Sequence, residues 1–372
     1  MFRRLAVLLI LVLAGCNDPG GVGSGLIDTI DGAPEVVRLE PAALVPEAGA
    51  DITGGTARFF AGLVEDPDLG SMSASAYVDF SAPASLSDAF RNGTVTRATL
   101  LLKSAFVYGY TGTLSEFDLR TVDAEFIGVG STADSVIQAG SIIAPFEFTV
   151  GSGNVEIPMP APWVTDWNTA LRSATFGGSF HGFALEPRVA RAVSGFDMTG
   201  TVLKVYAGGD SAYFPALTNF THVEADPLPA RTDGRVVFQD GRSAGYRLTF
   251  DFDDERLALA GLARGFITIE VDTTFAGTTP DGFVRPLARS LTIDAVSEDP
   301  PARLTVASAN LIDGVFYLEQ SELHTIMQRS IQGDSVLDYF ILRAPLAENG
   351  LGVLLLGGAK PPTASLTVLK AE

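Results

Sequence analysis

Apolar and polar residues alternate along many short stretches of this chain, and such alternation places successive side chains on opposite faces of a β-strand. Within residues 95–110, Ala98, Leu100, Leu102 and Phe106 share one parity, so we expect them on one buried face. Further strands are expected at residues 36–39, 59–64, 76–80, 117–126, 145–150, 182–187, 201–206, 246–252, 266–271, 291–296, 304–306, 339–343 and 364–369.

One stretch in the first half of the chain changes to the period of a helix. Val164, Trp167 and Leu171 lie at i, i+3 and i+7 within residues 162–171, so they share one side of a short helix. Trp163 lies four residues before Trp167, and we expect both rings to anchor this helix to the core rather than to bind a ligand.

The second half contains a matching helix at residues 321–331. Ser321 is a favourable N-cap, and one side of the helix is apolar, formed by Leu323, Ile326, Met327 and Ile331. In both halves the helix precedes a final pair of strands, which is the order that a diverged duplication would leave.

The sequence therefore divides into two units. Residues 35–207 are expected to form the first unit and residues 231–372 the second, joined by a linker at residues 208–230 that contains Gly208-Gly209 and Asp226-Pro227. We predict an all-β protein of two tandem jelly-roll-like antiparallel β-sandwiches, each with one short helix.

Composition supports strands joined by tight turns, and residues 65–70, Glu-Asp-Pro-Asp-Leu-Gly, are expected to form one of them. The chain has 47% hydrophobic residues, 39 glycines, 21 prolines and only four lysines. Its formal net charge is −19, and loss of residues 1–15, which carry two arginines, would change it to −21. So acidic a chain is a poor partner for nucleic acid. Its one cysteine, Cys16, leaves no intramolecular disulfide.

The N-terminus has the organisation of an export signal. Arg3-Arg4 precede the apolar run 5–13, which is too short to span a membrane. Leu13-Ala14-Gly15-Cys16 resembles the lipobox of bacterial lipoproteins, which implies a signal peptide of residues 1–15 and acylation of Cys16. An ordinary signal peptide beside an unrelated cysteine is the alternative.

An acylated Cys16 would make the membrane a partner of this protein, because acyl chains bury methylenes in the bilayer. Residues 16–34 are rich in Gly, Asp and Pro and are expected to form a flexible tether. Asn17-Asp18 does not resemble a clear inner-membrane retention signal. We therefore expect a protein of the cell envelope, anchored in the outer membrane, on its periplasmic or its extracellular face.

The sequence shows two resemblances to known secreted proteins. Ala-Thr-Leu-Leu-Leu at residues 98–102, the later Trp-containing helix and Gly-Phe-Ala-Leu-Glu-Pro at residues 182–187 look like the jelly-roll modules called DNRLRE domains, which are grouped with carbohydrate-binding modules. The lipobox, residues 22–27 and residues 62–70 resemble an uncharacterised family of Bacteroidota surface lipoproteins. The resemblance implies sugar binding for some relatives and transfers no catalytic residue.

We expect no enzyme active site. The three histidines, His181, His222 and His324, fall in a predicted loop, in the linker and on the polar side of the second helix, without partners at triad or zinc-ligand spacing. They are better explained as surface or capping residues.

No cofactor is expected, apart from a weak candidate site for structural calcium. Asp251, Asp253, Asp254 and Glu255 crowd the end of a predicted strand and offer the oxygen ligands that calcium prefers, but they lack the spacing of a calcium loop. A solvated, charged strand end is the alternative.

Aromatic residues give the one indication of recognition. Tyr108 and Tyr110 flank Gly109, so on a strand both rings would lie on one side and could stack on sugar rings. Tyrosines at a sheet edge without a ligand are the alternative. We expect a non-catalytic, lipid-anchored surface protein that binds extracellular polysaccharide; a structural subunit bound to another envelope protein, and a polysaccharide hydrolase or lyase, are the other candidates.

Overall fold

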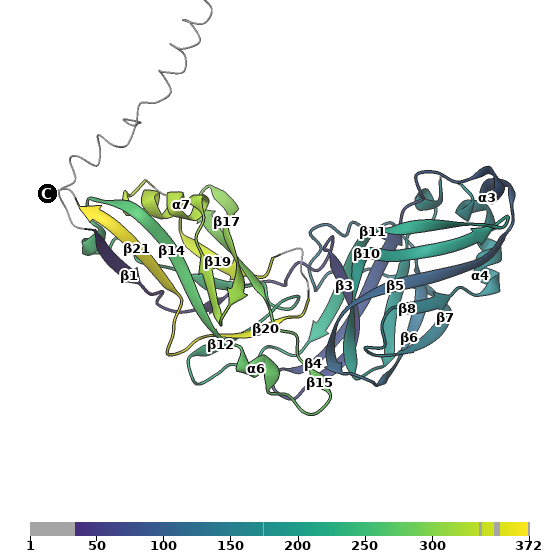
Figure 1. The fold of residues 1–372 in the computed structure, drawn as a ribbon, viewed down its shortest axis with the longest axis horizontal. Helices are drawn as coiled ribbons and strands as arrows, with labels where there is room; N and C mark the ends of the chain where they lie inside the picture. Colours follow the sequence, from purple (N-terminus) through teal and green to yellow (C-terminus); the bar gives the residue numbers. More distant parts are fainter. Residues whose placement is uncertain (1–33, 174, 335–336, 346–349, 371–372) are drawn as a thin grey trace, which may run out of the picture.

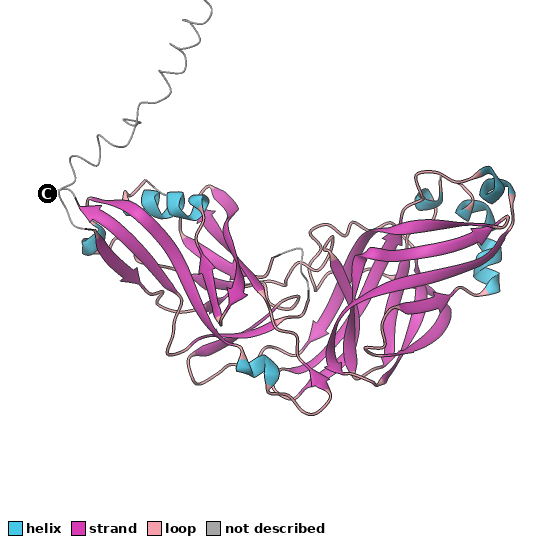
Figure 2. Ribbon diagram, viewed as in Figure 1, coloured by secondary structure: helices cyan, strands magenta, loops and turns pink. Residues whose placement is uncertain are grey.

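The computed structural model describes residues 34–173, 175–334, 337–345 and 350–370. The predicted signal peptide, the predicted lipidation site Cys16 and nearly all of the predicted tether lie outside this part. Two β-rich lobes meet at an angle (Figure 1), and strands make up most of both lobes (Figure 2). The all-β prediction is confirmed.

The first sandwich is one antiparallel sheet folded over its own core. Among the described residues, the hydrogen-bonded order is β15-β5-β10-β11-β4-β9-β6-β7, with β3 pairing β4 and β10, and β8 pairing β5. Phe117 of β6 and Leu203 of β10 lie far apart in this order yet share one buried cluster. The bounds are β3 Arg58–Asp66, β4 Gly70–Phe80, β5 Val95–Tyr110, β6 Leu114–Val122, β7 Ala139–Thr149, β8 Val155–Pro158, β9 Phe183–Val189, β10 Ala192–Ala207 and β11 Asp210–Ala225.

The second sandwich is built in the same way. Its described order is β1-β21-β14-β18-β17-β16-β19-β13-β2, with β20 pairing β12 and β14. Val37 of β1 and Leu248 of β13 belong to one buried cluster. The bounds are β1 Glu35–Leu39, β2 Val45–Pro46, β12 Arg235–Gln239, β13 Tyr246–Leu248, β14 Ala260–Asp272, β16 Ser290–Glu298, β17 Pro301–Ile312, β18 Val315–Leu318, β19 Tyr339–Arg343, β20 Val353–Gly357 and β21 Thr363–Lys370. β15, Phe283–Val284, comes from the same half of the chain but belongs to the sheet of the first sandwich.

Helices are short and more numerous than the one per sandwich that the sequence predicts. The first sandwich carries α3 (Asp88–Asn92), α4 (Ala161–Asp166) and α5 (Asn168–Leu171), and the second carries α6 (Thr274–Gly277) and α7 (Ser321–Ile331). The predicted helix at 162–171 is interrupted at Trp167, which ends α4. α7 has the predicted bounds, but its N-cap is Gln320 and not Ser321.

The two tryptophans are core anchors, as predicted. Trp163 is buried, and its ring meets Phe183 at 5.6 Å between centroids. The ring of Trp167 packs edge-on against Phe180 at 5.1 Å. Together they close one end of the first sandwich with aromatic rings.

The predicted linker at residues 208–230 is wrong, because most of it is strand β11. Gly208 and Gly209 have φ values of +60° and +82°, as a tight hairpin between β10 and β11 requires. β11 then pairs with both β10 and β4. A glycine pair that suggested a flexible linker in the sequence is therefore a turn inside the first sandwich.

The N-terminal boundary of the first unit is also wrong. β1 pairs with β21 and β2 pairs with β13, so residues 35–46 complete the second sandwich. They take the place that β11 takes in the first sandwich, where it pairs with β10 and β4. Two strand pairs of the first sandwich have counterparts in the second. The pair β4–β9 corresponds to β13–β19, and the pair β5–β10 corresponds to β14–β21.

β15 also links the two sandwiches, but it comes from the second half of the chain and joins the sheet of the first sandwich. Phe283 and Val284, from the second half of the chain, pair with Tyr110 and Gly109 at the end of β5. Each half of the sequence thus contributes a strand to the other half's sheet. Both described ends of the chain, at β1 and β21, lie side by side on the second sandwich, away from the first (Figure 1).

Candidate functional site

The tyrosine platform predicted at Tyr108 and Tyr110 does not form, because Tyr108 is fully buried with 0% exposure. Its hydroxyl donates to Asp66 Oδ2 at 2.8 Å, and its ring packs edge-on against Phe283 at 6.0 Å between centroids. The second sandwich covers this part of β5. Tyr110 is half-buried and lies at the rim of a groove.

A buried ion pair beneath Tyr108 fixes how the sandwiches meet. Neither the side chain of Asp66, at the end of β3, nor that of Arg285, just after β15, has exposed surface. Arg285 Nη2 donates to Asp66 Oδ1 at 2.6 Å, and Nε donates to Oδ2 at 2.8 Å. Burial raises the pKa of Asp66, but hydrogen bonds from Arg285, from the Asp68 amide and from Tyr108 outweigh it and leave the pKa below its usual value.

The turn after β3 holds this ion pair in place. Asp66 Oδ1 also accepts hydrogen bonds from the amides of Asp68 and Leu69, at 2.8 and 3.0 Å. Arg285 Nη2 donates to Asp68 Oδ2 at 2.9 Å, and Nη1 donates to the carbonyl of Phe275 at 2.8 Å. The turn predicted at residues 65–70 is therefore present, and it receives an arginine from the second sandwich.

Apolar residues from both sandwiches surround the ion pair. Phe60, Tyr108 and Val193 of the first sandwich form one buried cluster with Phe283 and Leu351 from the second half of the chain. Because water is excluded, the pair is weakly screened, and the two sandwiches are held in one orientation.

Asp51 makes a second connection across the junction. Its Oδ2 accepts a hydrogen bond from the amide of Gly241 at 2.8 Å, and its Oδ1 accepts one from its neighbour Ile52 at 2.8 Å. Arg242 donates to the carbonyls of Leu69 and Asp226. Burial raises the pKa of Asp51 to about 6, although the two amide hydrogen bonds act in the opposite direction.

Stability is expected to fall as pH rises from 4.5 to 7.5. Burial also raises the pKa of Asp79 to about 6, so in this window the folded state holds protons on Asp51 and Asp79 that the unfolded state has lost. Each group contributes on the order of 2–3 kcal/mol to the change. Urea unfolding at the two pH values measures it. Asp79→Asn, whose amide oxygen still accepts from the Phe80 amide, should remove about half of the dependence; an unchanged slope would contradict this assignment.

A groove lies on the first sandwich next to the junction. It has a volume of about 690 Å³ and is lined by the ends of β3 and β11, the start of β4, Tyr110, and the turn that carries Arg191. The Arg191 guanidinium lies 4.4 Å from the centre of the Tyr110 ring. Phe283 supports the same ring edge-on at 5.1 Å. Arg191 is exposed and, among the described residues, pairs with no carboxylate.

Carboxylates also line this groove. Glu65, Glu224 and Asp226 all line it. Asp226 Oδ2 accepts from the amide of Ser71 at 2.7 Å, so its position is fixed. Ala225 and Asp226 also line an adjoining cavity of about 620 Å³, which reaches the second sandwich. The groove therefore offers a stacked guanidinium, an aromatic ring and several hydrogen-bond acceptors.

The calcium candidates do not converge. Asp251 accepts from the amide of Asp253 at 3.1 Å, whereas Asp254 accepts from Arg256, at 2.9 Å from Nε and 2.7 Å from Nη2. Glu255 starts the short 3₁₀ turn that follows. In the described part of the chain, no three His, Cys, Asp or Glu side chains gather closely enough to hold a metal ion.

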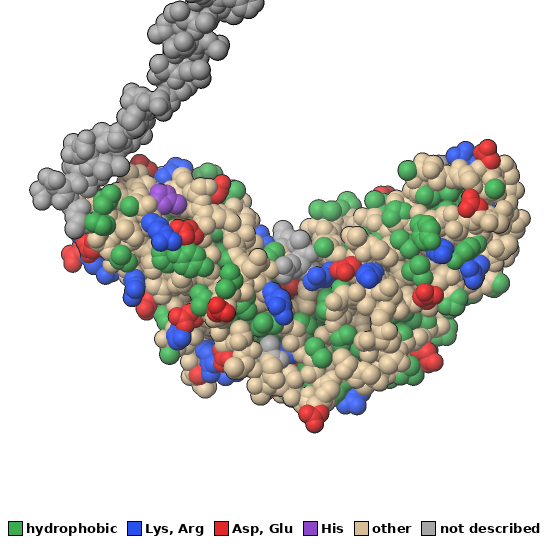
Figure 3. Space-filling model, viewed as in Figure 1, with side chains coloured by type: hydrophobic (Ala, Val, Ile, Leu, Met, Phe, Trp, Pro, Cys, Tyr) green, Lys and Arg blue, Asp and Glu red, His purple; other side chains and the backbone are tan. Residues whose placement is uncertain are grey.

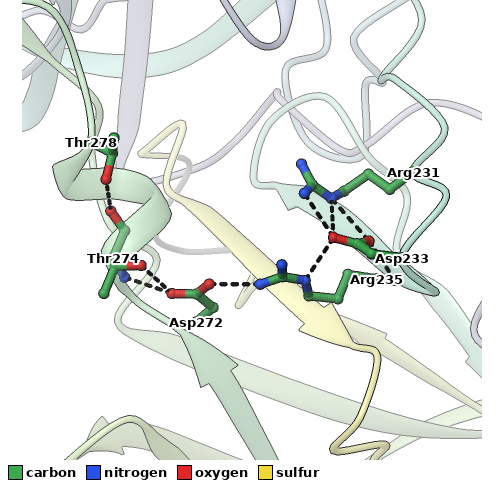
Figure 4. Close-up of polar contacts among 6 residues, drawn as sticks. All are labelled: Arg231, Asp233, Arg235, Asp272, Thr274 and Thr278. Carbon is green, nitrogen blue, oxygen red and sulfur yellow. Dashed lines mark hydrogen bonds and ion pairs between the residues drawn. The ribbon is translucent and has the colours of Figure 1, made fainter.

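A chain of ion pairs crosses the second sandwich near the junction (Figure 4). Arg231 Nη2 and Arg235 Nε both donate to Asp233, at 2.8 and 3.0 Å, and Arg235 Nη1 donates to Asp272 at 2.7 Å. The Thr274 amide donates to the other oxygen of Asp272 at 3.0 Å. Because these charges neutralise one another, the chain ties β12 to β14 rather than offering a free charge.

The sequence prediction missed one motif that is associated with catalysis. Residues 241–245 read Gly-Arg-Ser-Ala-Gly, the Gly-x-Ser-x-Gly pattern of a nucleophile elbow. That motif requires a strand-to-helix turn and a histidine, whereas residues 241–245 join two strands, β12 and β13. His222 bonds the carbonyl of Ser135 at 2.9 Å and His324 that of Leu262 at 3.2 Å, and neither lines the cavity beside Ser243.

No helix within the described residues is long and apolar enough to cross a membrane. The fold and the groove define an all-β protein of two interlocked sandwiches with a groove beside their junction.

Comparison with known proteins adds little. No protein-family model matches the chain, and no curated protein matches it. One solved structure aligns with 91% of this chain and with 100% of the other chain. That protein is from Parabacteroides distasonis ATCC 8503 and is provisionally described as secreted. The two chains are 11% identical and the TM-score of the alignment is 0.23.

Proposed function

We propose that this chain is a non-catalytic binding module of the cell envelope, held to the outer membrane by acylated Cys16, and that it binds extracellular polysaccharide in the groove beside Tyr110. The observation that carries the proposal is Arg191 stacked on the Tyr110 ring, at 4.4 Å, without a carboxylate partner among the described residues.

These groups fit the chemistry of a sugar. A sugar ring presents C–H groups on its faces and hydroxyls around its edge, so it is recognised by aromatic surface together with fixed donors and acceptors. Arg191 presents a planar set of N–H donors, which stacking on Tyr110 orients. Glu65, Glu224 and Asp226 supply acceptors for hydroxyls across the groove.

The placement of the chain ends supports a display role. Described residues begin beside β21 on the second sandwich, so a tether from Cys16 would join the protein at that lobe. The chain from Cys16 to Pro34 can span at most about 60 Å. A lipid anchor there would hold the protein at the second sandwich, whereas the groove lies on the first.

A polysaccharide hydrolase is the second candidate. Glu65, Glu224 and Asp226 line one groove, and glycoside hydrolysis requires two carboxyl groups flanking the scissile bond. Release of reducing ends from any glycan that binds would favour this interpretation, and intact glycan after prolonged incubation would favour binding alone.

Arg191→Ala is expected to weaken saccharide binding about tenfold, since loss of its hydrogen bonds corresponds to roughly 1.4 kcal/mol. A glycan array should first identify the ligand with the chain beginning at Asn17, and titration calorimetry should then compare the variants. Arg188→Ala is the matched control, because Arg188 lies three residues earlier and pairs with Asp118 at 3.7 Å outside the groove. Equal affinities for all three proteins would exclude the groove as the binding site.

A further inference from the structure

The outer face of β5, β10 and β11 carries a second group of aromatic and basic side chains, separate from the groove. In register, Arg97 of β5 lies opposite Tyr206 of β10, and Lys204 of β10 lies opposite Tyr213 of β11. The alternate residues of these strands, including Leu203, point into the buried core. Period-two alternation therefore fixes Arg97, Lys204, Tyr206 and Tyr213 on the outside.

The two cations of this face rest on the two rings. Arg97 Cζ lies 4.0 Å from the centre of the Tyr206 ring. Lys204 Nζ lies between the rings, 5.0 Å from the centre of Tyr206 and 5.2 Å from that of Tyr213. Tyr213 is 51% exposed, so one ring of the group is open to a ligand.

Neither Arg97 nor Lys204 pairs with a carboxylate within the part of the chain that the structure describes. Arg264, by contrast, contacts Glu319 at 2.7 and 2.9 Å while it also lies over Phe266. On the view in Figure 3, basic side chains lie next to acidic ones at several places. In a chain of net charge −19, these two cations lie together on adjacent tyrosine rings and form a local concentration of positive charge.

The acidic residues beside this face form no ion pair with Arg97 or Lys204 among the described residues. Asp210, at the β10–β11 hairpin, accepts hydrogen bonds from the Ser87 hydroxyl at 2.6 Å and the Ser211 amide at 2.7 Å. Glu156 of β8 lies opposite Leu101, in the next row of the sheet. Hydrogen bonds to Tyr206 and Tyr213 raise the pKa of Lys204, so its ammonium stays charged at neutral pH.

We propose that Arg97, Lys204, Tyr206 and Tyr213 form a binding surface for acidic polysaccharide, a polymer of sugar rings that carry carboxylates. The cations would pair with the carboxylates of the polymer, and the tyrosine rings would contact the faces of its sugar rings. The surface would thus complement the polymer in both charge and shape. The hairpin end of this face contacts α3, at the end of the first lobe farthest from the described chain ends (Figure 1). That position favours a polymer outside the cell over the lipid surface that would hold Cys16.

The test compares polygalacturonate with neutral dextran, using the chain beginning at Asn17. Arg97→Gln with Lys204→Gln is expected to raise the dissociation constant for polygalacturonate at least tenfold at low salt, a change of about 1.4 kcal/mol. Arg264→Gln, which removes a cation already paired with Glu319, is the matched control and should have no effect. Tyr213→Ala should weaken binding while leaving its salt dependence unchanged, because it removes a ring and no charge.

The outcomes separate this proposal from the groove. Polygalacturonate binding that survives Arg191→Ala but not the Arg97/Lys204 pair supports the second surface, whatever the groove binds. Loss in Arg191→Ala alone, or no binding of polygalacturonate at low salt, overturns it. Equal binding of phosphatidylserine vesicles or duplex DNA would make the face a general anion site and would overturn the polysaccharide assignment.

Discussion

Arg285→Met is expected to lower the free energy of unfolding by about 3–5 kcal/mol, the largest stability effect of any single substitution considered for this chain. The substitution leaves Asp66 buried without its cation, in a junction where neither side chain is exposed to water. The remaining donors, the amides of Asp68 and Leu69 and the Tyr108 hydroxyl, compensate only part of that charge. Urea unfolding of the chain beginning at Asn17 measures the loss.

Two comparisons separate the buried charge from a general loss of packing. Asp66→Asn combined with Arg285→Met removes both charges, and it should recover much of the stability that the single variant loses. Arg256→Met breaks an ion pair with Asp254 that is equally short, at 2.7 Å, but exposed, and it should leave the unfolding midpoint nearly unchanged. If Arg285→Met unfolds at the wild-type midpoint, the junction does not depend on this pair.

Cys16→Ser is expected to release the protein from the membrane almost completely. The hydroxyl of serine is not the thiol that the lipid-transfer reaction uses, so the variant would lose every acyl methylene, each of which contributes about 0.8 kcal/mol of membrane binding. Fractionation into membrane and soluble pools, with acylation followed by mass spectrometry, measures the effect. Membrane retention at the wild-type level would refute the anchor.

The pattern of apolar and polar residues predicted the elements whose structure depends mainly on residues close by in the sequence. Alternation in residues 95–110 placed Ala98, Leu100, Leu102 and Phe106 on one buried face, and the first three have 0% exposure. Phe106 is only half-buried and packs against the cluster at the junction, because the register of β5 with β10 shifts between Ser104 and Phe106. The apolar stripe of residues 321–331 predicted α7 with its observed bounds. Turn chemistry predicted the bend after β3, where Gly70 has a φ of +81°.

Pairing between distant segments was not predictable in this way. Nothing in residues 35–46 shows that they pair with β21 and β13, more than 190 residues later, because strand pairing depends on register partners rather than on local period. For the same reason the sequence placed Tyr108 on a strand but could not show that Phe283 and Arg285 cover it.

The candidate site depends both on local sequence pattern and on contacts between distant segments. Tyr110 was recognisable from the sequence, whereas Arg191 was not, because its role depends on a turn that places it over a ring 81 positions earlier. The burial of Tyr108 also has a consequence for recognition: it fixes β5 against the second sandwich, so that Tyr110 and Phe283 hold the groove's rim in one geometry. A groove with a fixed rim loses little entropy when a ligand binds.

The most direct test of the account is amide hydrogen exchange of the chain beginning at Asn17, with and without a saturating glycan selected on the array. We predict slower exchange at residues 63–65, 71–73, 190–191 and 224–226, which line the groove, with little change in the second sandwich beyond the junction. Protection confined to other residues, or a complete absence of a saturable glycan, would contradict a polysaccharide site in this groove.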